Sequence, residues 1–192
     1  MGIWRKLYDA VLKASGHRRA VWFLGGLSFA ESSFFPIPPD VMLAPMVLAR
    51  PHRAWFLATV TTLTSVAGGI AGYFIGAYML GMAQEAMEAA HLWEKYLTVR
   101  DWFGDYGFWA VLIAGFSPIP YKVFTIAAGA GHMLFIPFVV ASLIGRGARF
   151  FLVAGLVKVA GPAMEERLLG YIDIIGWILV ALIAVGVIVY QF

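Results

Sequence analysis

Long apolar runs separated by short polar segments are the main pattern along this chain, and they predict membrane-spanning helices. Residues 54–80 form a run of 27 residues without a charged side chain, which is long enough to cross a bilayer with some tilt. Two later runs are also long enough, although the first of them carries two arginines near its middle. We therefore expect transmembrane helices at residues 54–80, 133–157 and 171–191.

Two other apolar runs, residues 20–49 and 107–130, are interrupted by prolines. A single helix over residues 20–49 would be about 45 Å long, whereas the hydrocarbon core of a bilayer is about 30 Å thick. Proline removes a backbone donor and pushes the preceding residue toward an extended conformation, so each run should break into two short helices. We expect both runs to be re-entrant hairpins, with tips at Pro36, Pro38, Pro39, Pro118 and Pro120.

The two interrupted runs share a Pro-Ile-Pro motif, and the two motifs lie 82 residues apart. Each motif is followed by a predicted span, so the unit of hairpin plus helix occurs twice. One complete span separates the hairpins, which must then enter the membrane from opposite sides. The predicted fold is an all-α membrane protein with an inverted repeat of two re-entrant helical hairpins, each followed by a transmembrane helix. Such paired interruptions are typical of a substrate site near the membrane midplane.

The polar segments predict the orientation of this single membrane domain, residues 1–192. Residues 1–19 are rich in bases and should form an interfacial amphipathic helix, whereas the amphipathic segment at residues 81–106 has five acids against two bases. Basic segments stay on the cytoplasmic side. We expect a multi-pass protein of the bacterial inner (plasma) membrane, with a cytoplasmic N-terminus and residues 81–106 on the outer side.

The composition supports a membrane protein and argues against several other classes. Hydrophobic residues make up 61% of the chain and charged residues 13%, with a mean hydropathy of +0.82, which is more apolar surface than a soluble domain of this length can bury. The charge distribution gives no support to nucleic-acid binding. The chain has no cysteine. It also has no motif that is typical of a metal site, a phosphate-binding glycine loop or a membrane protease. We expect no enzymatic activity, no cofactor and no metal.

Five ionisable residues fall inside the apolar runs that end before residue 158, namely Glu31, Asp40, Lys122, Arg146 and Arg149. An unpaired charge near the bilayer centre costs about 2.5 to 3.5 kcal/mol, so these side chains should face a polar cavity or one another. One hypothesis is that Glu31 and Asp40 bind and release protons. Arg146 and Arg149, three residues apart on one helical face, would then bind a substrate phosphate together with Lys122. The alternative is that the charges pair and only hold the hairpins together.

Three glycines at four-residue spacing, Gly68, Gly72 and Gly76, lie within the predicted span at residues 54–80. Glycines at this spacing form a smooth stripe along one helical face. We expect another helix to pack closely against it.

The stretches at residues 31–40, 115–129 and 145–150 resemble the DedA family, also called the VTT or SNARE-associated Golgi protein superfamily, and in particular its shorter YqaA-like branch. The resemblance implies an inner-membrane lipid translocator for polyprenyl phosphate or phosphatidylethanolamine, and dependence on the proton-motive force is proposed for several members. It also implies that Glu31 and Asp40 match the acidic pair of the first hairpin. Many members carry arginines in the second hairpin where this chain has Gly115 and Tyr121, which shifts anion binding toward Lys122, Arg146 and Arg149.

The leading hypothesis is a proton-coupled flippase or scramblase whose partners are a membrane phospholipid or polyprenyl phosphate and protons. Two alternatives stay open at this point. One is a proton-coupled exchanger of small ions or drugs, and the other is a non-transporting membrane assembly factor in which the charges are structural. The sequence leaves the oligomeric state open, with a homo-oligomer as one option.

Overall fold

The structure is a computed structural model that describes residues 20–33, 38–89, 93–117 and 119–160. Within these ranges it contains helices and no strand, as predicted. The expected interfacial helix at residues 1–19 and the expected span at residues 171–191 lie outside the described residues, as do Pro36 and Pro118 of the predicted tips.

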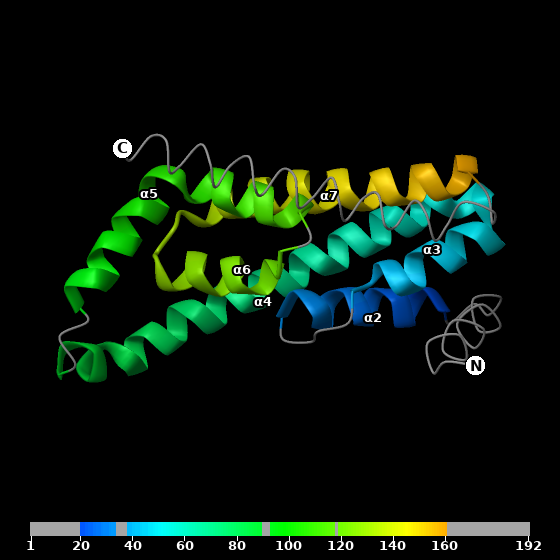
Figure 1. Cartoon of the computed structure of the whole chain (residues 1–192). Helices are drawn as coiled ribbons and strands as arrows, with labels where there is room; N and C mark the ends of the chain where they lie inside the picture. The colour runs from blue at the N-terminus through cyan, green and yellow to red at the C-terminus, as the bar shows by residue number, and fades with distance from the viewer. Residues whose placement is uncertain (1–19, 34–37, 90–92, 118, 161–192) are drawn as a thin grey trace, which may run out of the picture.

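The first interrupted run forms two helices, α2 (Ala20–Ser33) and α3 (Asp40–Ala49). The chain reverses direction between them, so that both helices have their outer ends on the same side of the molecule (Figure 1). Pro39 directly precedes α3 and has φ −67°, a value that suits the start of a helix. A short 3₁₀ helix, η1 (Pro51–Arg53), then leads into the first long helix.

The long helix α4 runs over Ala54–Ala89, and α5 over Trp93–Phe116. Helix α4 therefore continues beyond the predicted end of the span at residue 80. The predicted outer segment, residues 81–106, is not a separate element but is divided between the end of α4 and the first half of α5. The physical reason is that neither stretch contains a proline, so polar residues there change the surface of the helix without ending it.

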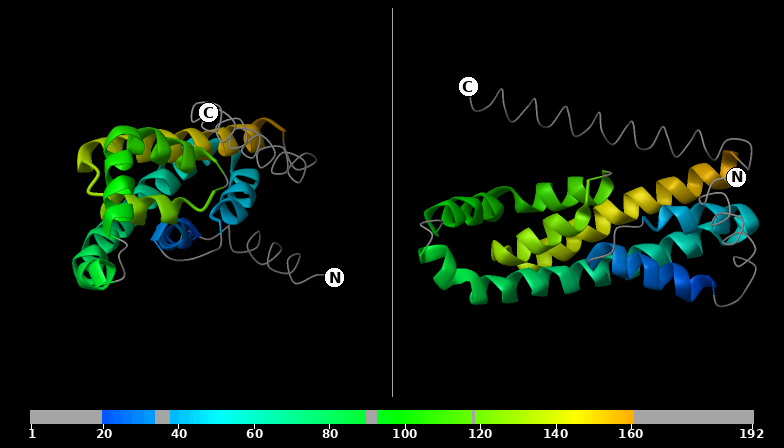
Figure 2. Two further views of the ribbon diagram at one scale, coloured as in Figure 1. Left: turned by 60° about the vertical axis from the view of Figure 1, so that its left-hand side comes forward. Right: turned by 60° about the horizontal axis from the view of Figure 1, so that its bottom comes forward.

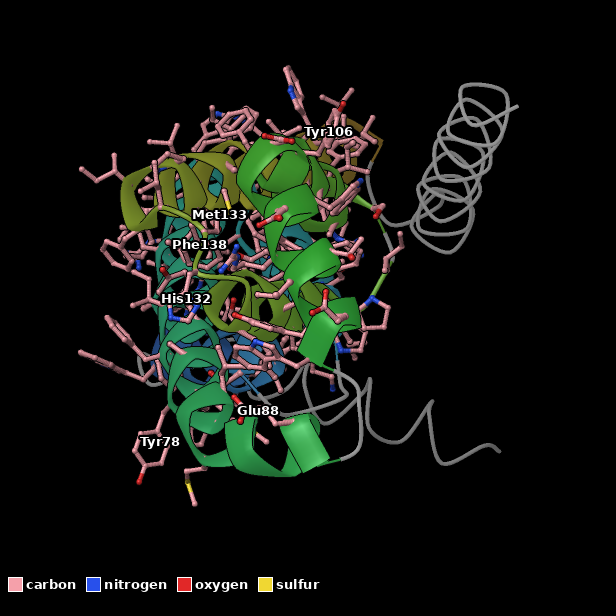
Figure 3. All side chains as sticks on the ribbon, turned by 90° about the vertical axis from the view of Figure 1, so that its left-hand side faces the viewer. Tyr78, Glu88, Tyr106, His132, Met133 and Phe138 are labelled. Carbon is pink, nitrogen blue, oxygen red and sulfur yellow. The ribbon has the colours of Figure 1, made fainter. Side chains whose placement is uncertain are left out.

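The second hairpin consists of α5 and α6 (Tyr121–Ala130), and it is followed by α7 (Phe135–Ala160). It opens at the end of the molecule opposite to the opening of the first hairpin (Figures 1 and 2). Its first arm is longer than predicted, because α5 begins at Trp93 and not at Gly107. At the open end, His132 and Met133 lie in the turn between α6 and α7 (Figure 3), and the Tyr73 hydroxyl donates to the Met133 carbonyl at 2.5 Å.

The two repeats pack in the same way around the two long helices. Helix α2 lies along α4 and α5 lies along α7, while α6 packs on α4 and α3 packs on α7. Glycines permit these close approaches. A Cβ atom on Gly68 would collide with the Phe29 carbonyl of α2, and one on Gly76 with the Ile126 carbonyl of α6. The predicted glycine stripe is thereby confirmed as a packing surface, and it holds one arm of each hairpin.

Two separate apolar clusters form the core, with a polar layer between them. The cluster at the first hairpin uses Leu57 of α4 and Phe150 and Val153 of α7, while the cluster at the second hairpin uses Phe138 of α7. The arginines of α7 lie between these positions in the sequence. Buried polar side chains occupy the same level, including Ser32, Ser65, Thr125 and Ser142.

The outer surface carries large apolar side chains on several helices. Trp22, Tyr78, Met82, Trp109 and Ile136 all have more than half of their surface exposed, and Tyr78 points away from the helices in Figure 3. Two described stretches, Pro51–Leu80 and Phe135–Val159, are long and apolar enough to cross a membrane by length and composition. Extensive exposed apolar surface marks a surface that contacts lipid or protein.

We predict opposite effects for alanine at two helical glycines. Gly76→Ala should destabilise the protein by about 1 to 3 kcal/mol, because the new Cβ collides with the α6 backbone. Gly26→Ala is the matched control: a Cβ there meets nothing within 4 Å, so the higher helix propensity of alanine should be neutral or stabilise by up to about 1 kcal/mol. Thermal unfolding of the detergent-solubilised variants measures both. Equal stability of the two variants would contradict the close approach of α4 and α6.

Candidate functional site

The structure brings four of the five predicted charged residues together in the polar layer. Arg146 and Arg149 extend from α7, Glu31 from the last turn of α2, and Asp40 from the first turn of α3. The arginines form two ion pairs, Arg146 with Glu31 at 2.5 Å and Arg149 with Asp40 at 2.7 Å. The acids of the first hairpin are thus the counter-ions of the arginines in the second repeat.

Arg146 is held by a continuous hydrogen-bond chain. Its Nη2 donates to Oε2 of Glu31, and its Nε donates to the Ser65 hydroxyl at 2.5 Å. The hydroxyls of Ser65 and Ser32 are 2.7 Å apart, and Ser32 donates to Glu31 at 3.1 Å. This chain joins α2, α4 and α7, so each polar group along it has a partner.

Two aromatic rings cover the Arg146 guanidinium. Its central carbon lies 4.9 Å from the ring centroid of Tyr121 and 4.7 Å from that of Phe150. Both rings are fully buried, and Arg146 is 3% exposed. Aromatic faces attract a cation and do so more strongly when water is excluded. Tyr121 begins α6, so this contact also ties the second hairpin to α7.

Arg149 connects the two hairpin tips directly. Its Nη2 donates to Oδ2 of Asp40, which follows Pro39 at the first tip. Its Nη1 donates to the backbone carbonyl of Ser117 at 2.9 Å, and more weakly to that of Phe116 at 3.5 Å, at the second tip. One side chain therefore bridges both interruptions of the inverted repeat.

The tips add positive electrostatic potential to this layer. Helices α3 and α6 both begin at a tip, at Asp40 and Tyr121, and a helix N-terminus carries about half a positive charge. The two arginines and two acids cancel in formal charge. Lys122, the fifth predicted residue, lies in the first turn of α6 and is half-buried. The surroundings of the ion pairs therefore favour an anion.

Several residues of the site do not follow from the charge pattern. Ser32, Ser65 and Tyr121 contact Arg146. They are uncharged, so they do not stand out in the sequence of an apolar helix. A sequence signal exists for the serines, because Ser28 and Ser32, like Thr61 and Ser65, are four residues apart and so share one helical face. For Tyr121 the signals are its position directly after the second Pro-Ile-Pro motif and the family resemblance, in which it stands where many members carry an arginine.

Comparison with known proteins identifies relatives over most of the chain. The model of the VTT domain matches residues 37–159, a stretch that includes Asp40 and both arginines. An uncharacterized protein of Haemophilus influenzae is 44% identical over 190 residues, which covers 97% of each chain. An uncharacterized protein of Histophilus somni is 40% identical over 190 residues, covering 99% of this chain and 98% of that protein.

A shorter match links the chain to a named transporter. Undecaprenyl phosphate transporter A of Staphylococcus aureus is 49% identical over 46 residues, which is 24% of this chain and 23% of that protein. No solved structure matches the chain significantly.

We predict strong energetic coupling between Glu31 and Arg146. Glu31→Gln and Arg146→Gln should each destabilise the protein by about 3 kcal/mol, because each leaves a buried partner charge uncompensated. The double variant should be less destabilised than the sum of the two by about 1 to 3 kcal/mol. Thermal unfolding of the four proteins gives this coupling energy.

The matched control is the ion pair of Arg100 and Asp101, whose side chains are 44% and 68% exposed. A cycle of Arg100→Gln and Asp101→Asn should give no measurable coupling, since water and salt screen such a pair. Additive effects at Glu31 and Arg146 would contradict the geometry of the buried pair.

Proposed function

Because the chain belongs to the VTT domain (DedA) family, we propose that it is a membrane protein that moves a phosphate-bearing lipid between leaflets. The substrate would be a lipid such as polyprenyl phosphate or phosphatidylethanolamine, and protons would be coupled to its movement. The name of the Staphylococcus aureus relative supports this substrate class for a part of the chain. The proposal includes no enzymatic step.

The lengths of the helices support the proposed membrane arrangement. Helices α2, α3 and α6 have 14, 10 and 10 residues, so each is about 15 to 21 Å long, whereas the hydrocarbon core is about 30 Å thick. Short helices that reverse at a proline-rich tip suit re-entrant hairpins. Helices α4 and α7 would span the bacterial inner membrane, with a cytoplasmic N-terminus and the exposed aromatic and aliphatic side chains facing lipid.

The observation that carries the proposal is the position of the two arginine–carboxylate pairs. Arg146 is the twelfth residue of α7, a helix of 26 residues, so it lies about 17 Å from the helix start and about 21 Å from its end. This places the pairs at mid-depth of the proposed span. Charged side chains are expensive there, and in known transporters they mark the path of a substrate or an ion.

The ion pairs suggest how phosphate and protons could be coupled. A phosphate competes with the carboxylates for the same guanidinium donors, because both are oxygen anions that accept bidentate hydrogen bonds. The cluster of two arginines and two acids is neutral, so an added anion leaves a net negative charge in a medium of low dielectric constant. Protonation of Glu31 or Asp40 removes that cost. Phosphate binding would then be favoured together with proton uptake.

The same pairs also favour a second candidate, a non-transporting assembly factor. Buried ion pairs that join α2, α3, α4, α7 and the second tip could serve only to hold the two hairpins in register. This reading and the transport proposal make different predictions for lipid movement.

We predict that the purified protein in liposomes accelerates the movement of labelled phosphatidylethanolamine or polyprenyl phosphate, and that an acidic compartment on one side increases the rate. Arg149→Lys should lower the rate at least tenfold, because lysine keeps the charge but not the planar guanidinium. Arg100→Lys, at an exposed pair, is the matched control and should stay within about twofold of wild type. Flux of small ions or drugs without lipid movement would instead favour the exchanger.

A charge-swapped variant separates the transporter from the assembly factor. Asp40→Arg combined with Arg149→Asp should restore the stability lost in either single variant, since the pair is rebuilt in reverse. A transporter with this swap should fold but move lipid at least tenfold more slowly, because the anion-binding group has moved to the other hairpin. Stability is read by thermal unfolding and transport by the liposome assay. Wild-type protein that moves no lipid would support the assembly factor.

A further inference from the structure

The two ion pairs differ in how completely their polar atoms are bonded. Around Arg146, the carboxylate, both serine hydroxyls and the guanidinium form one hydrogen-bond chain, and two aromatic rings cover the cation. A ligand that entered there would have to break several of these contacts. The Glu31–Arg146 pair therefore has the character of a fixed clamp.

Near the Asp40–Arg149 pair, two buried oxygen atoms of the described residues lack a hydrogen-bond partner. Among the described residues, Oδ1 of Asp40 and the hydroxyl of Ser117 are buried without a hydrogen-bond partner. Asp40 is 7% exposed and Ser117 is 1% exposed. A buried polar atom without a partner costs about 1 to 3 kcal/mol. Both atoms belong to residues that Arg149 already binds, through Oδ2 of Asp40 and the carbonyl of Ser117.

Two other buried hydroxyls in the described residues do not belong to this group. Within this described part of the chain, the hydroxyls of Tyr121 and Ser142 are also buried without a hydrogen-bond partner. The Tyr121 ring covers the guanidinium of Arg146, so its hydroxyl belongs to the surroundings of the other ion pair.

The hydrogen-bonding chemistry of Asp40, Ser117 and Arg149 limits which ligand can bind between them. Arg149 and the Ser117 hydroxyl can donate hydrogen bonds, whereas an ionised Asp40 can only accept them. The ligand should therefore present several anionic oxygens and one O–H group. A singly protonated phosphomonoester has both, whereas a phosphodiester has no hydrogen on its phosphate. The tip N-termini of α3 and α6 add a favourable potential for such an anion.

We propose that Asp40, Arg149 and the hydroxyl of Ser117 form the subsite that binds the phosphate, and that this subsite prefers a phosphomonoester to a phosphodiester. Glu31 and Arg146 remain paired throughout, so Asp40 is the acid that takes part in proton coupling, and the proton taken up is the one that the phosphate O–H shares with Asp40. The inference rests on the proposed function for the class of substrate. It adds Ser117 as a binding residue. It also assigns different roles to Glu31 and Asp40, which the sequence alone does not distinguish.

The test compares two small probes that differ in one methyl group. Methyl phosphate and dimethyl phosphate are titrated into the full-length protein in detergent, and binding is measured by calorimetry. Wild type should bind methyl phosphate about tenfold more tightly, because one charge-assisted hydrogen bond to Asp40 is lost with dimethyl phosphate. Equal affinities for the two probes, or no binding of methyl phosphate, would overturn the subsite.

Three variants locate the effect. Ser117→Ala should weaken methyl phosphate binding about five- to tenfold, since it removes one donor. Ser28→Ala is the matched control, because Ser28 is a buried serine that donates to the Thr61 carbonyl between α2 and α4. The affinity of this variant for methyl phosphate should equal that of wild type. Asp40→Asn should reduce the preference for methyl phosphate to less than about threefold. An unchanged affinity in Ser117→Ala, or an unchanged preference in Asp40→Asn, would also overturn the subsite.

Two further arms separate this inference from the proposed function. Dodecyl phosphate should bind more tightly than methyl phosphate if the natural ligand is a lipid, and equally if it is a free phosphate monoester. Methyl phosphate binding that follows the predictions, in a protein that moves no lipid in liposomes, would refute the transport function and leave the subsite standing. Lipid movement that Ser117→Ala does not slow would refute the subsite and leave the transport function standing.

Discussion

The burial of two arginines in the middle of α7 is the constraint on which the rest of the structure depends. A guanidinium cannot lose its proton, so a buried arginine must be paired or leave a large desolvation cost uncompensated. Glu31 and Asp40 supply the pairing, and both belong to the first hairpin. The proline-rich interruption is therefore more than a break in a helix, because it ends α2 and starts α3 at the positions where the acids reach the arginines.

Close backbone contact makes this arrangement possible. Glycines of α4 let α2 and α6 approach until backbone carbonyls touch the helix, and Gly145 of α7 does the same for the Leu112 carbonyl of α5. The two repeats thus share one packing scheme but differ in content. Helix α4 presents glycines and Ser65 at the central level, whereas α7 presents the arginines. The positive charge of the site comes from one repeat and the acids from the other, which makes the centre asymmetric.

This asymmetry bears on function, because the two ion pairs have different surroundings. The pair at Arg146 is enclosed by serines and aromatic rings, so it is suited to hold α2, α4, α6 and α7 together. The pair at Arg149 lies between the tips and retains buried polar atoms of Asp40 and Ser117 without partners. Under the proposed transport function, the centre must open to a polar headgroup while the protein stays folded. The division would then allow one contact to break while the other persists.

The sequence by itself determined the all-helical class, the interruptions at the two Pro-Ile-Pro motifs and the list of charged candidates, because proline geometry and the cost of buried charge act locally along the chain. The full lengths of α4 and α5 were missed, because the polar residues at 81–89 and 93–106 were expected to lie outside the helices, although neither stretch contains a proline. Only the tertiary structure decided which acid pairs with which arginine and that Ser65, Tyr121 and Ser117 join the site. Glu31 and Arg146 are far apart in the chain, and their contact depends on how three helices pack, which no local pattern encodes.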